Sequence, residues 1–305
     1  MKLIFAGTPA VAVPSLLALA ATDHTIAAVI TRTDAPLGRK RVLTPSPVAD
    51  AADSLGFDVL KTNRLDEAAT EQIAARQPDL GVIVAYGGIV REPLLSVPRL
   101  GWINLHFSLL PRWRGASPVQ RAVIAGDELS GAAVFQLVRE LDAGAVFGQI
   151  SQPIGAHSTS GHLLETLSHS GAELLVRVVA ALADGTAEAV EQAGDVTLAP
   201  KLTIEDARVD WTQPATVVYN RVRGVTPEPG AFTTVDGTRF KLLEVAPVRE
   251  VPPLPAGMIC ERDKKVLVGT GSEPLELLSV QPAGKTAMTA SDWWRGISVS
   301  EVMAS

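Results

Sequence analysis

The sequence predicts an α/β protein with two domains, a doubly wound and mostly parallel β-sheet followed by a small β-barrel. Three observations lead to this prediction. A chain of 305 residues is long enough for two domains, each with its own hydrophobic core. Apolar, β-prone runs alternate with helical patterns up to about residue 185, as in strands joined by covering helices. Beyond residue 229 the pattern changes to short β-prone pieces separated by turns.

The alternation begins at the start of the chain. Residues 2–6 are an apolar run that ends at Gly7, and residues 13–20 follow with helical spacing, which predicts a strand, a tight turn and a helix. Further strands are expected at residues 26–31, 58–60, 80–85, 103–107, 132–137 and 146–152. Further helices are expected at residues 50–56, 66–76, 119–126 and 158–182. Because only Gly7 of a Gly-x-Gly-x-x-Gly pattern is present, we expect no dinucleotide site here.

The regular pattern stops near residue 185. The residues that follow are small and polar without a clear period, so we interpret residues 186–206 as a linker. Residues 214–223 have a helical pattern. Short strands are then expected at residues 232–234, 239–245, 257–260, 266–268 and 275–280, with Asp236-Gly237 as one of the turns. Several short strands in about a hundred residues predict a small barrel.

The composition is that of an ordinary globular protein, with 47% hydrophobic and 20% charged residues. The first residues lack the apolar region and cleavage site of a signal peptide, and no apolar stretch approaches the ~20 residues of a membrane-spanning helix. Cys260 is the only cysteine, which excludes an intrachain disulfide and fits a reducing cytoplasm. The histidines show no ligand-like grouping, so no metal is expected. The net charge of −6 argues mildly against a protein coated in nucleic acid but leaves a local basic patch open.

The candidate functional site lies at one of the predicted strands and the loop after it. Asn104 and His106 stand at alternate positions, and because strand side chains alternate between the two faces, both should point the same way. Pro111 and Gly115 then break the pattern, which predicts a loop at the carboxyl end of the strand. In open parallel sheets, ligands bind at that edge. Asp142 follows on a separate loop.

These residues carry a family resemblance. Residues 104–121 contain Asn-x-His-x-Ser-Leu-Leu-Pro followed by Arg-Trp-Arg-Gly-Ala-x-Pro-x-Gln-Arg, a run that resembles the formyltetrahydrofolate-dependent formyltransferases. Its first half is shared with other formyl transferases and with formyl-folate hydrolases. The longer run, the Ala-Arg-Val-Asp-Trp of residues 207–211 and the Gln-Pro-Ala-Gly-Lys-x-x-Met of residues 281–288 resemble the methionyl-tRNA formyltransferase family.

The resemblance implies a Rossmann-like catalytic domain at residues 1–185, the linker at 186–206, and an OB-like, tRNA-binding domain at 207–305. It implies an enzyme that transfers the formyl group of 10-formyltetrahydrofolate to the α-amino group of methionine on initiator methionyl-tRNA, through a tetrahedral intermediate. The expected partners are that folate and that tRNA, and the protein is expected to be a cytoplasmic monomer. Two alternatives stay open: transfer to another amine, such as a nucleotide sugar, and a non-catalytic RNA- or folate-binding protein.

The resemblance assigns the catalytic roles to Asn104, His106 and Asp142. Formyl transfer to an amine develops an oxyanion, and it needs hydrogen-bond donors for that oxygen and a path for a proton between two nitrogens. Asn104 offers an amide donor and His106 a ring donor. A carboxylate near the imidazole would favour its charged form and fix its orientation, and Asp142 is the candidate.

The binding residues rest on the same resemblance. Folate binding is expected at a proline-stiffened loop and at the end of a neighbouring strand, namely at Ser108, Leu109, Leu110, Pro111, Tyr86 and Gly87. A packing role for the Tyr86 ring has equal support. The candidates for tRNA binding are Arg39, Lys40, Arg41 and Arg114, and the alternative for the first three is a solvated surface loop. The residues alone do not decide whether Arg112, Trp113 and Arg114 face the folate or the RNA.

Three positions depart from the family pattern. Phe107 stands where a small residue is common, which is expected to narrow the pocket. Glu228 stands where tryptophan is common, which removes a stacking role from that turn. The basic loop contains Gly38-Arg39-Lys40-Arg41 in place of Gly-Arg-Gly, which changes the reach of its cations.

Overall fold

The structure is a computed structural model that describes residues 1–38 and 40–305. It divides into two compact units. Their segments are Met1–Pro118, Leu129–Pro153 and Leu164–Ala199 in the first unit, and Val119–Glu128, Ile154–Leu163 and Pro200–Ser305 in the second. The linker expected at residues 186–206 is therefore divided between the units, with residues 186–199 in the first. The candidate Arg39 lies outside the described residues.

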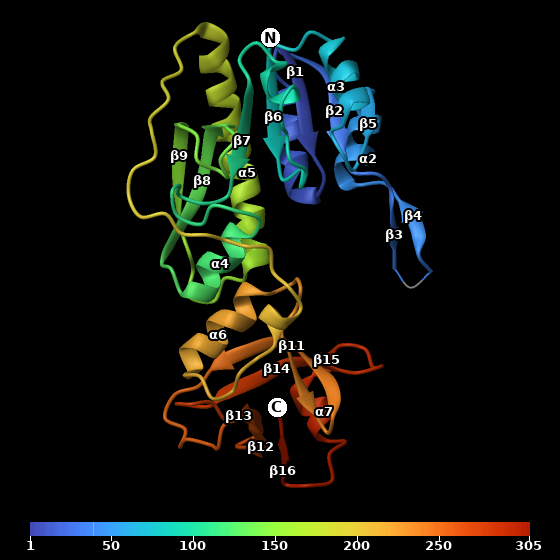
Figure 1. Ribbon diagram of the computed structural model, residues 1–305. Helices are drawn as coiled ribbons and strands as arrows, with labels where there is room; N and C mark the ends of the chain where they lie inside the picture. The colour runs from blue at the N-terminus through green and yellow to red at the C-terminus, as the bar shows by residue number, and fades with distance from the viewer. Residues whose placement is uncertain (39) are drawn as a thin grey trace. The chain divides into compact units, whose positions relative to one another are not determined.

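The first unit is built on a seven-stranded sheet in the order β5-β2-β1-β6-β7-β8-β9 (Figure 1). The strands are β1 (Lys2–Gly7), β2 (Thr25–Thr31), β5 (Val59–Lys61), β6 (Leu80–Val84), β7 (Trp102–His106), β8 (Leu129–Gln136) and β9 (Val146–Pro153). The pairs from β5 to β7 are parallel, and β8 and β9 join antiparallel. The predicted doubly wound, mostly parallel sheet is confirmed.

Helices join these strands. They are α1 (Val13–Ala20), α2 (Pro47–Ser54), α3 (Glu67–Ala74), α4 (Pro118–Ala125) and α5 (Ser160–Asp184), with short 3₁₀ turns at Ala10–Ala12 and Leu94–Ser96. The α2 and α3 helices begin where the sequence provides a cap, because the side chains of Ser46 and Asp66 accept hydrogen bonds from the backbone N–H of Ala49 and Ala69. No helix in the described part of the chain is long and apolar enough to cross a membrane.

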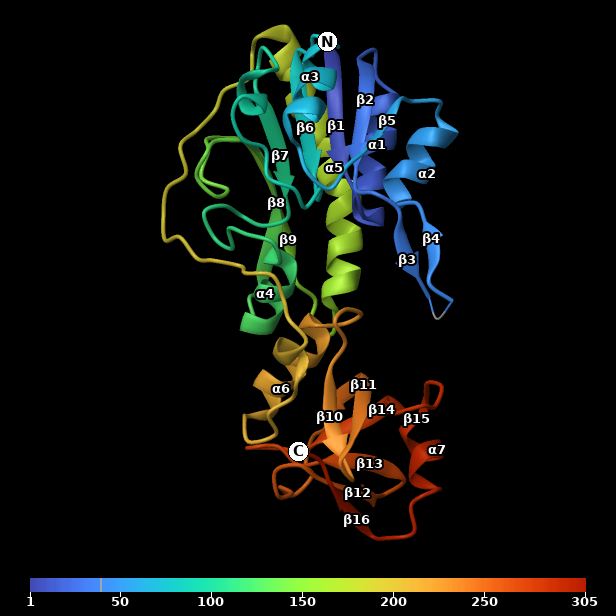
Figure 2. The same cartoon turned by 45° about the vertical axis from the view of Figure 1, so that its right-hand side comes forward.

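The two faces of the sheet bury different helices. Ile4 and Ala6 of β1 join Ile73 of α3 and Trp102 of β7 in one buried cluster. On the other face α1 and α5 lie side by side (Figure 2). A Cβ at Gly171 of α5 would lie 3.1 Å from the Leu105 side chain of β7, so this helix packs on the Leu105 face. The strand period thus leaves Asn104 and His106 on the α3 face.

The basic segment after β2 is a hairpin, where the sequence predicts only an unpacked loop. Strands β3 (Ala35–Leu37) and β4 (Val42–Thr44) pair antiparallel around a turn. The aliphatic side chains of Leu37 and Leu43 are 66% and 68% exposed. Backbone pairing between two three-residue strands therefore forms this arm without a buried face.

The second unit is built on an antiparallel sheet in the order β10-β11-β14-β13-β12-β16, with β15 paired to β14. The strands are β10 (Phe232–Val235), β11 (Thr238–Pro247), β12 (Met258–Arg262), β13 (Lys265–Val268), β14 (Leu275–Pro282), β15 (Met288–Thr289) and β16 (Glu301–Met303). Val235 of β10 pairs with Ala304 after β16, and the backbones of Thr234 and Ser305 exchange two hydrogen bonds of 2.9 Å. The two edges of the sheet therefore meet, and the predicted barrel is confirmed.

Helix α6 (Ala215–Gly224) lies where a helix is predicted, and a 3₁₀ turn at Glu205–Ala207 precedes it. The short helix α7 (Ala290–Trp294) is not predicted, because five residues are too few to show a helical period. The core includes Trp211, whose indole N–H donates to the Thr233 hydroxyl over 2.9 Å.

Arg223 of α6 is a charged side chain in this interior, only 8% exposed. Among the described residues no carboxylate lies within ion-pair distance of it. Its guanidinium donates instead to the Asn220 side chain and to the carbonyls of Gly155 and Ser158, over 3.0 to 3.2 Å. Burial lowers the pKa of Arg223 from its ordinary value. The side chain thus connects α6 to the turn before α5.

Candidate active site

The strand β7 presents Asn104 and His106 on one face of the sheet, as the alternation predicts. Asn104 is partly exposed, and its amide makes no side-chain hydrogen bond to any residue that the structure describes. His106 is 6% exposed, and its ring meets the Phe135 ring of β8 edge-on, with ring centroids 6.3 Å apart. The strand therefore offers one unengaged amide beside one buried imidazole.

Both nitrogens of the His106 ring face polar groups. Nε2 lies 2.9 Å from the carbonyl oxygen of Trp113, and because a carbonyl only accepts, the ring proton of the neutral form is assigned to Nε2. Nδ1 lies 3.8 Å from the Asp142 carboxylate. Burial lowers the pKa of His106 below its ordinary 6.5, and the Asp142 charge and the Trp113 carbonyl oppose this. The ring is therefore neutral at neutral pH, and Nδ1 is the nitrogen that can take up a proton.

The loop that follows His106 holds the Asp142 carboxylate in place. The backbone N–H of Gly115 donates to the Asp142 carboxylate over 2.7 Å, and Asp142 has a left-handed φ of 46°. Gly115 itself has a φ of 128°, and a Cβ there would lie 2.6 Å from the Ala199 carbonyl oxygen. A larger residue at 115 would push away either the backbone near Ala199 or the N–H that binds Asp142.

Residues 190–199, which we call the strap, cross these loops. The backbone of Val190 exchanges two hydrogen bonds with Val146. The Thr197 hydroxyl accepts from the Trp113 N–H over 2.8 Å, and the backbone of Arg114 pairs with Thr197 and Ala199. Sequence reasoning assigned this stretch to a linker, since its partners lie elsewhere in the chain and it has no period that could reveal them.

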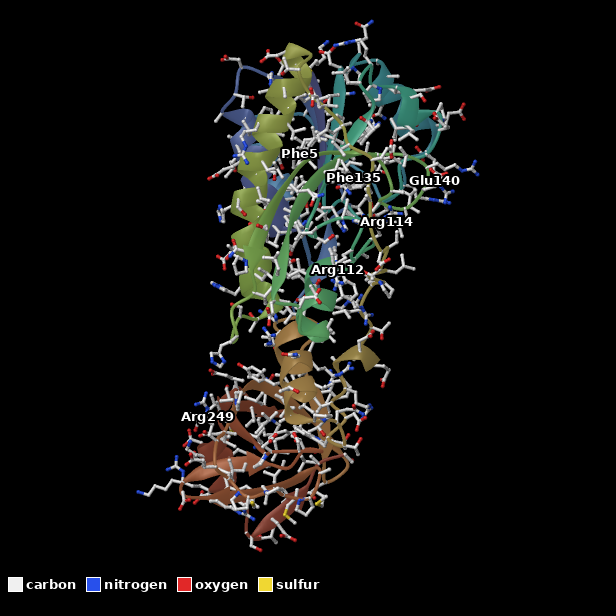
Figure 3. All side chains as sticks on the ribbon, turned by 90° about the vertical axis from the view of Figure 1, so that its left-hand side faces the viewer. Phe5, Arg112, Arg114, Phe135, Glu140 and Arg249 are labelled. Carbon is white, nitrogen blue, oxygen red and sulfur yellow. The ribbon has the colours of Figure 1, made fainter. Side chains whose placement is uncertain are left out.

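Gln192 of the strap connects the two loops of the site. Its carbonyl oxygen accepts from Nε and Nη2 of Arg114, over 3.1 and 2.7 Å. Its amide nitrogen donates to the backbone carbonyls of Asp142 and Gly144, over 2.8 and 2.9 Å. Figure 3 shows Arg114 pointing toward the strap on the face of the sheet opposite α5. Gln192 is a site residue that sequence reasoning missed, and only its amide chemistry could have suggested it.

The four folate candidates on the loop after β7 have different surroundings. Ser108 is buried, and its hydroxyl donates to the Arg112 carbonyl over 2.6 Å. Leu110 packs in a buried cluster with Ala133 and Phe135 of β8. Leu109 is partly exposed, and Pro111 is buried. The loop therefore rests on the sheet through Leu110, and Leu109 keeps surface for a ligand.

The candidates Tyr86 and Gly87 lie at the end of β6, the strand beside β7. The Tyr86 ring is 1% exposed, and its hydroxyl donates to the Thr62 carbonyl over 3.0 Å, which supports the packing alternative for this ring. The carbonyl of Gly87 accepts from Arg32, whose guanidinium also lies 5.8 Å from the centre of the Tyr86 ring. The backbone of this turn, rather than the Tyr86 ring, is accessible to a ligand.

The candidates for tRNA binding lie on two separate elements. Lys40 and Arg41 are exposed at the turn between β3 and β4, whereas Arg114 is partly exposed and bound to Gln192. The exposed Arg112 lies 5.4 Å from the ring centre of Trp113. Of the departures from the family pattern, Phe107 is buried and Glu228 is exposed.

Comparisons with known proteins cover the whole chain. A family profile described as formyl transferase matches residues 1–179, and one described as formyl transferase, C-terminal domain, matches residues 201–298. The methionyl-tRNA formyltransferase of Clavibacter sepedonicus is 59% identical over 304 residues, with 100% of both chains covered. That of Leifsonia xyli subsp. xyli is 61% identical over 304 residues, again with 100% of both covered.

A solved structure is similar in fold. WlaRD, a sugar 3N-formyl transferase crystallised in the presence of dTDP and 5-N-formyl-THF, matches with a TM-score of 0.70 and 14% identity. The match covers 94% of this chain and 99% of that chain. At this identity the likeness concerns the fold alone.

Proposed function

Because the chain belongs to the formyl transferase family, and within it to the methionyl-tRNA formyltransferases, we propose that it formylates the methionine carried by initiator tRNA. The formyl donor in this proposal is 10-formyltetrahydrofolate. The proposal rests chiefly on one observation, the 59% and 61% identity to enzymes of that name over the full length of each chain. The sugar-modifying enzyme shares only 14% identity, so the match does not favour a sugar amine as acceptor.

The proposed reaction moves one formyl group and one proton. The α-amino nitrogen of methionine attacks the formyl carbon, and a tetrahedral carbon with an oxyanion forms. The bond between this carbon and N10 of the folate then breaks. The methionine nitrogen loses a proton and N10 gains one, so the products are formylmethionyl-tRNA and tetrahydrofolate.

Asn104 and His106 divide this work in our proposal. The Asn104 amide, which is not engaged by a described residue, donates to the oxyanion. His106 takes up and returns the migrating proton at Nδ1, since burial keeps the ring neutral and its Nε2 proton already faces the Trp113 carbonyl. The Asp142 carboxylate, 3.8 Å from Nδ1, stabilises the imidazolium that forms.

The substrates require separate surfaces. We propose that the folate binds along residues 108–111 and against the turn at Tyr86 and Gly87, where Leu109 and backbone groups are accessible. We propose that the tRNA contacts Arg39, Lys40 and Arg41, with Arg114 as a further contact and the second unit as a further tRNA-binding surface. The enzyme then acts as a monomer in the cytoplasm, where initiator tRNA is charged.

One assay tests this function. The purified protein is supplied with 10-formyltetrahydrofolate and initiator tRNA charged with methionine, and formylmethionine is measured after release from the tRNA. Uncharged tRNA, free methionine and an amino sugar nucleotide serve as alternative acceptors. We expect turnover with the charged tRNA alone. Formylation of the sugar amine without RNA, or no turnover with any acceptor, would overturn the proposal.

A further inference from the structure

We propose that Gln192 is a positioning residue for formyl transfer. Its amide holds the Asp142 loop so that the carboxylate stays 3.8 Å from Nδ1 of His106. This inference rests on the function proposed above. Asp142 belongs to no strand or helix, so the sheet does not fix the position of its carboxylate. Its carboxylate is held on one side by a single backbone N–H, that of Gly115.

Gln192 supplies the missing support from the other side. Its NH₂ group donates to the carbonyls of Asp142 and Gly144, so both ends of the Asp142 turn bind one side chain. Its oxygen accepts from Arg114, the residue next to Gly115. A closed cycle results, from Gly115 to the Asp142 carboxylate, from the Asp142 backbone to Gln192, and from Gln192 back to Arg114. The cycle fixes one loop against the other.

The strap holds Gln192 itself in place. Val190, two residues before it, is paired with Val146 of β9. Thr197 and Ala199, after it, are bonded to the backbone of residues 113–117. Gln192 is therefore anchored on both sides, as a side chain must be if it is to restrain a loop rather than follow it.

The Gln192 side chain is also suited to this position because it carries no charge. Arg114 forms no ion pair with Asp142 in the described chain, because the amide of Gln192 stands between the guanidinium and the Asp142 turn. The Asp142 carboxylate thus remains directed at His106 instead of being neutralised by Arg114. A carboxylate at position 192 would keep the Arg114 contact, lose both donors to the turn, and place a negative charge against the carbonyls of Asp142 and Gly144.

The test compares Gln192→Ala and Gln192→Glu with Gln72→Glu, a matched change at an exposed position of α3. We expect both Gln192 variants to lower kcat by about 10- to 100-fold, since small misplacement of a catalytic group has costs of that order. The KM for the formyl folate should stay within about threefold. The acid limb of the kcat profile should move to lower pH in Gln192→Ala, because a displaced Asp142 carboxylate raises the pKa of His106 less, and it should stay unmoved in Gln72→Glu.

A second measurement is independent of turnover. The His106 ring is titrated by NMR in the free protein, where we expect its pKa to fall in Gln192→Ala relative to wild type and to Gln72→Glu, because the Asp142 charge is displaced. The thermal midpoint of each variant shows whether it is folded, and if Gln192→Ala is unfolded, the kcat of Gln192→Glu still decides the question. Folded Gln192 variants with kcat, acid limb and His106 titration all like wild type would overturn the inference. Failure of wild type to use charged tRNA would instead overturn the proposed function.

Discussion

Replacement of Asp142 by asparagine tests the central pair of the proposed mechanism. The change removes one negative charge and keeps nearly the same shape. The asparagine oxygen can still accept from the Gly115 N–H, and asparagine tolerates the left-handed φ of 46° observed at this position. The fold of the loop should therefore survive, and the thermal midpoint should change little.

The size of the effect follows from the geometry. Opposite charges 3.8 Å apart attract each other by about 4 kcal/mol at an effective dielectric constant of about 20. If this attraction stabilises the imidazolium formed during transfer, its loss lowers kcat by about 10³-fold. The Asp142 charge also raises the pKa of His106 against the dominant effect of burial, so its removal lowers that pKa further. The acid limb of the rate profile then moves to lower pH.

The assay is formylation of charged initiator tRNA as a function of pH, with the KM for the formyl folate measured in parallel. The matched control is Asp195→Asn, the same chemical change at an exposed strap position. We expect an unchanged rate profile in the control and a KM within about threefold in both variants. A kcat for Asp142→Asn within about threefold of wild type, with the acid limb unmoved, would refute the role assigned to the carboxylate.

Three further predictions concern stability and RNA binding. Because the pKa of His106 is lowered in the folded state, the unfolded chain binds a proton below pH 6.5 that the native state does not. Stability should therefore fall as the pH drops below 6.5, and His106→Asn should flatten this dependence in urea unfolding; equal slopes would contradict the assignment. Arg223→Met removes the buried guanidinium and its hydrogen bonds to the carbonyls of Gly155 and Ser158, and we expect a loss of about 1–2 kcal/mol in unfolding free energy, partly offset by removal of a buried charge. An unchanged urea midpoint would show that these bonds are not needed. Replacing Lys40 and Arg41 together by glutamine should reduce the salt dependence of tRNA binding by about one unit of log–log slope per lost phosphate contact, while Lys264→Gln on an exposed turn should not. A slope equal to that of wild type would support the alternative that this segment is a solvated surface loop without a role in tRNA binding.

The order of strands and helices is predictable from the sequence because each element rests on local physics. The alternation of side chains is enough to place Asn104 and His106 on one face of a strand, and capping residues mark the starts of α2 and α3. The prediction failed where elements are short. Neither the β3–β4 hairpin nor α7 is long enough to show a period, and their formation depends on backbone pairing and on packing in the second unit.

The strand-and-loop motif around residue 104 determined two of the three catalytic candidates and the expected chemistry, and nothing local placed the third. Gly115 and Asp142, which share a hydrogen bond, are 27 residues apart, and Arg114 and Gln192 are 78 residues apart. Loops have no repeating pattern that encodes such contacts, because each is fixed by what the rest of the fold brings beside it. Tertiary structure alone decided that the supposed linker crosses the site, that the His106 ring is buried and neutral, and that Gln192 joins the loops around Asp142.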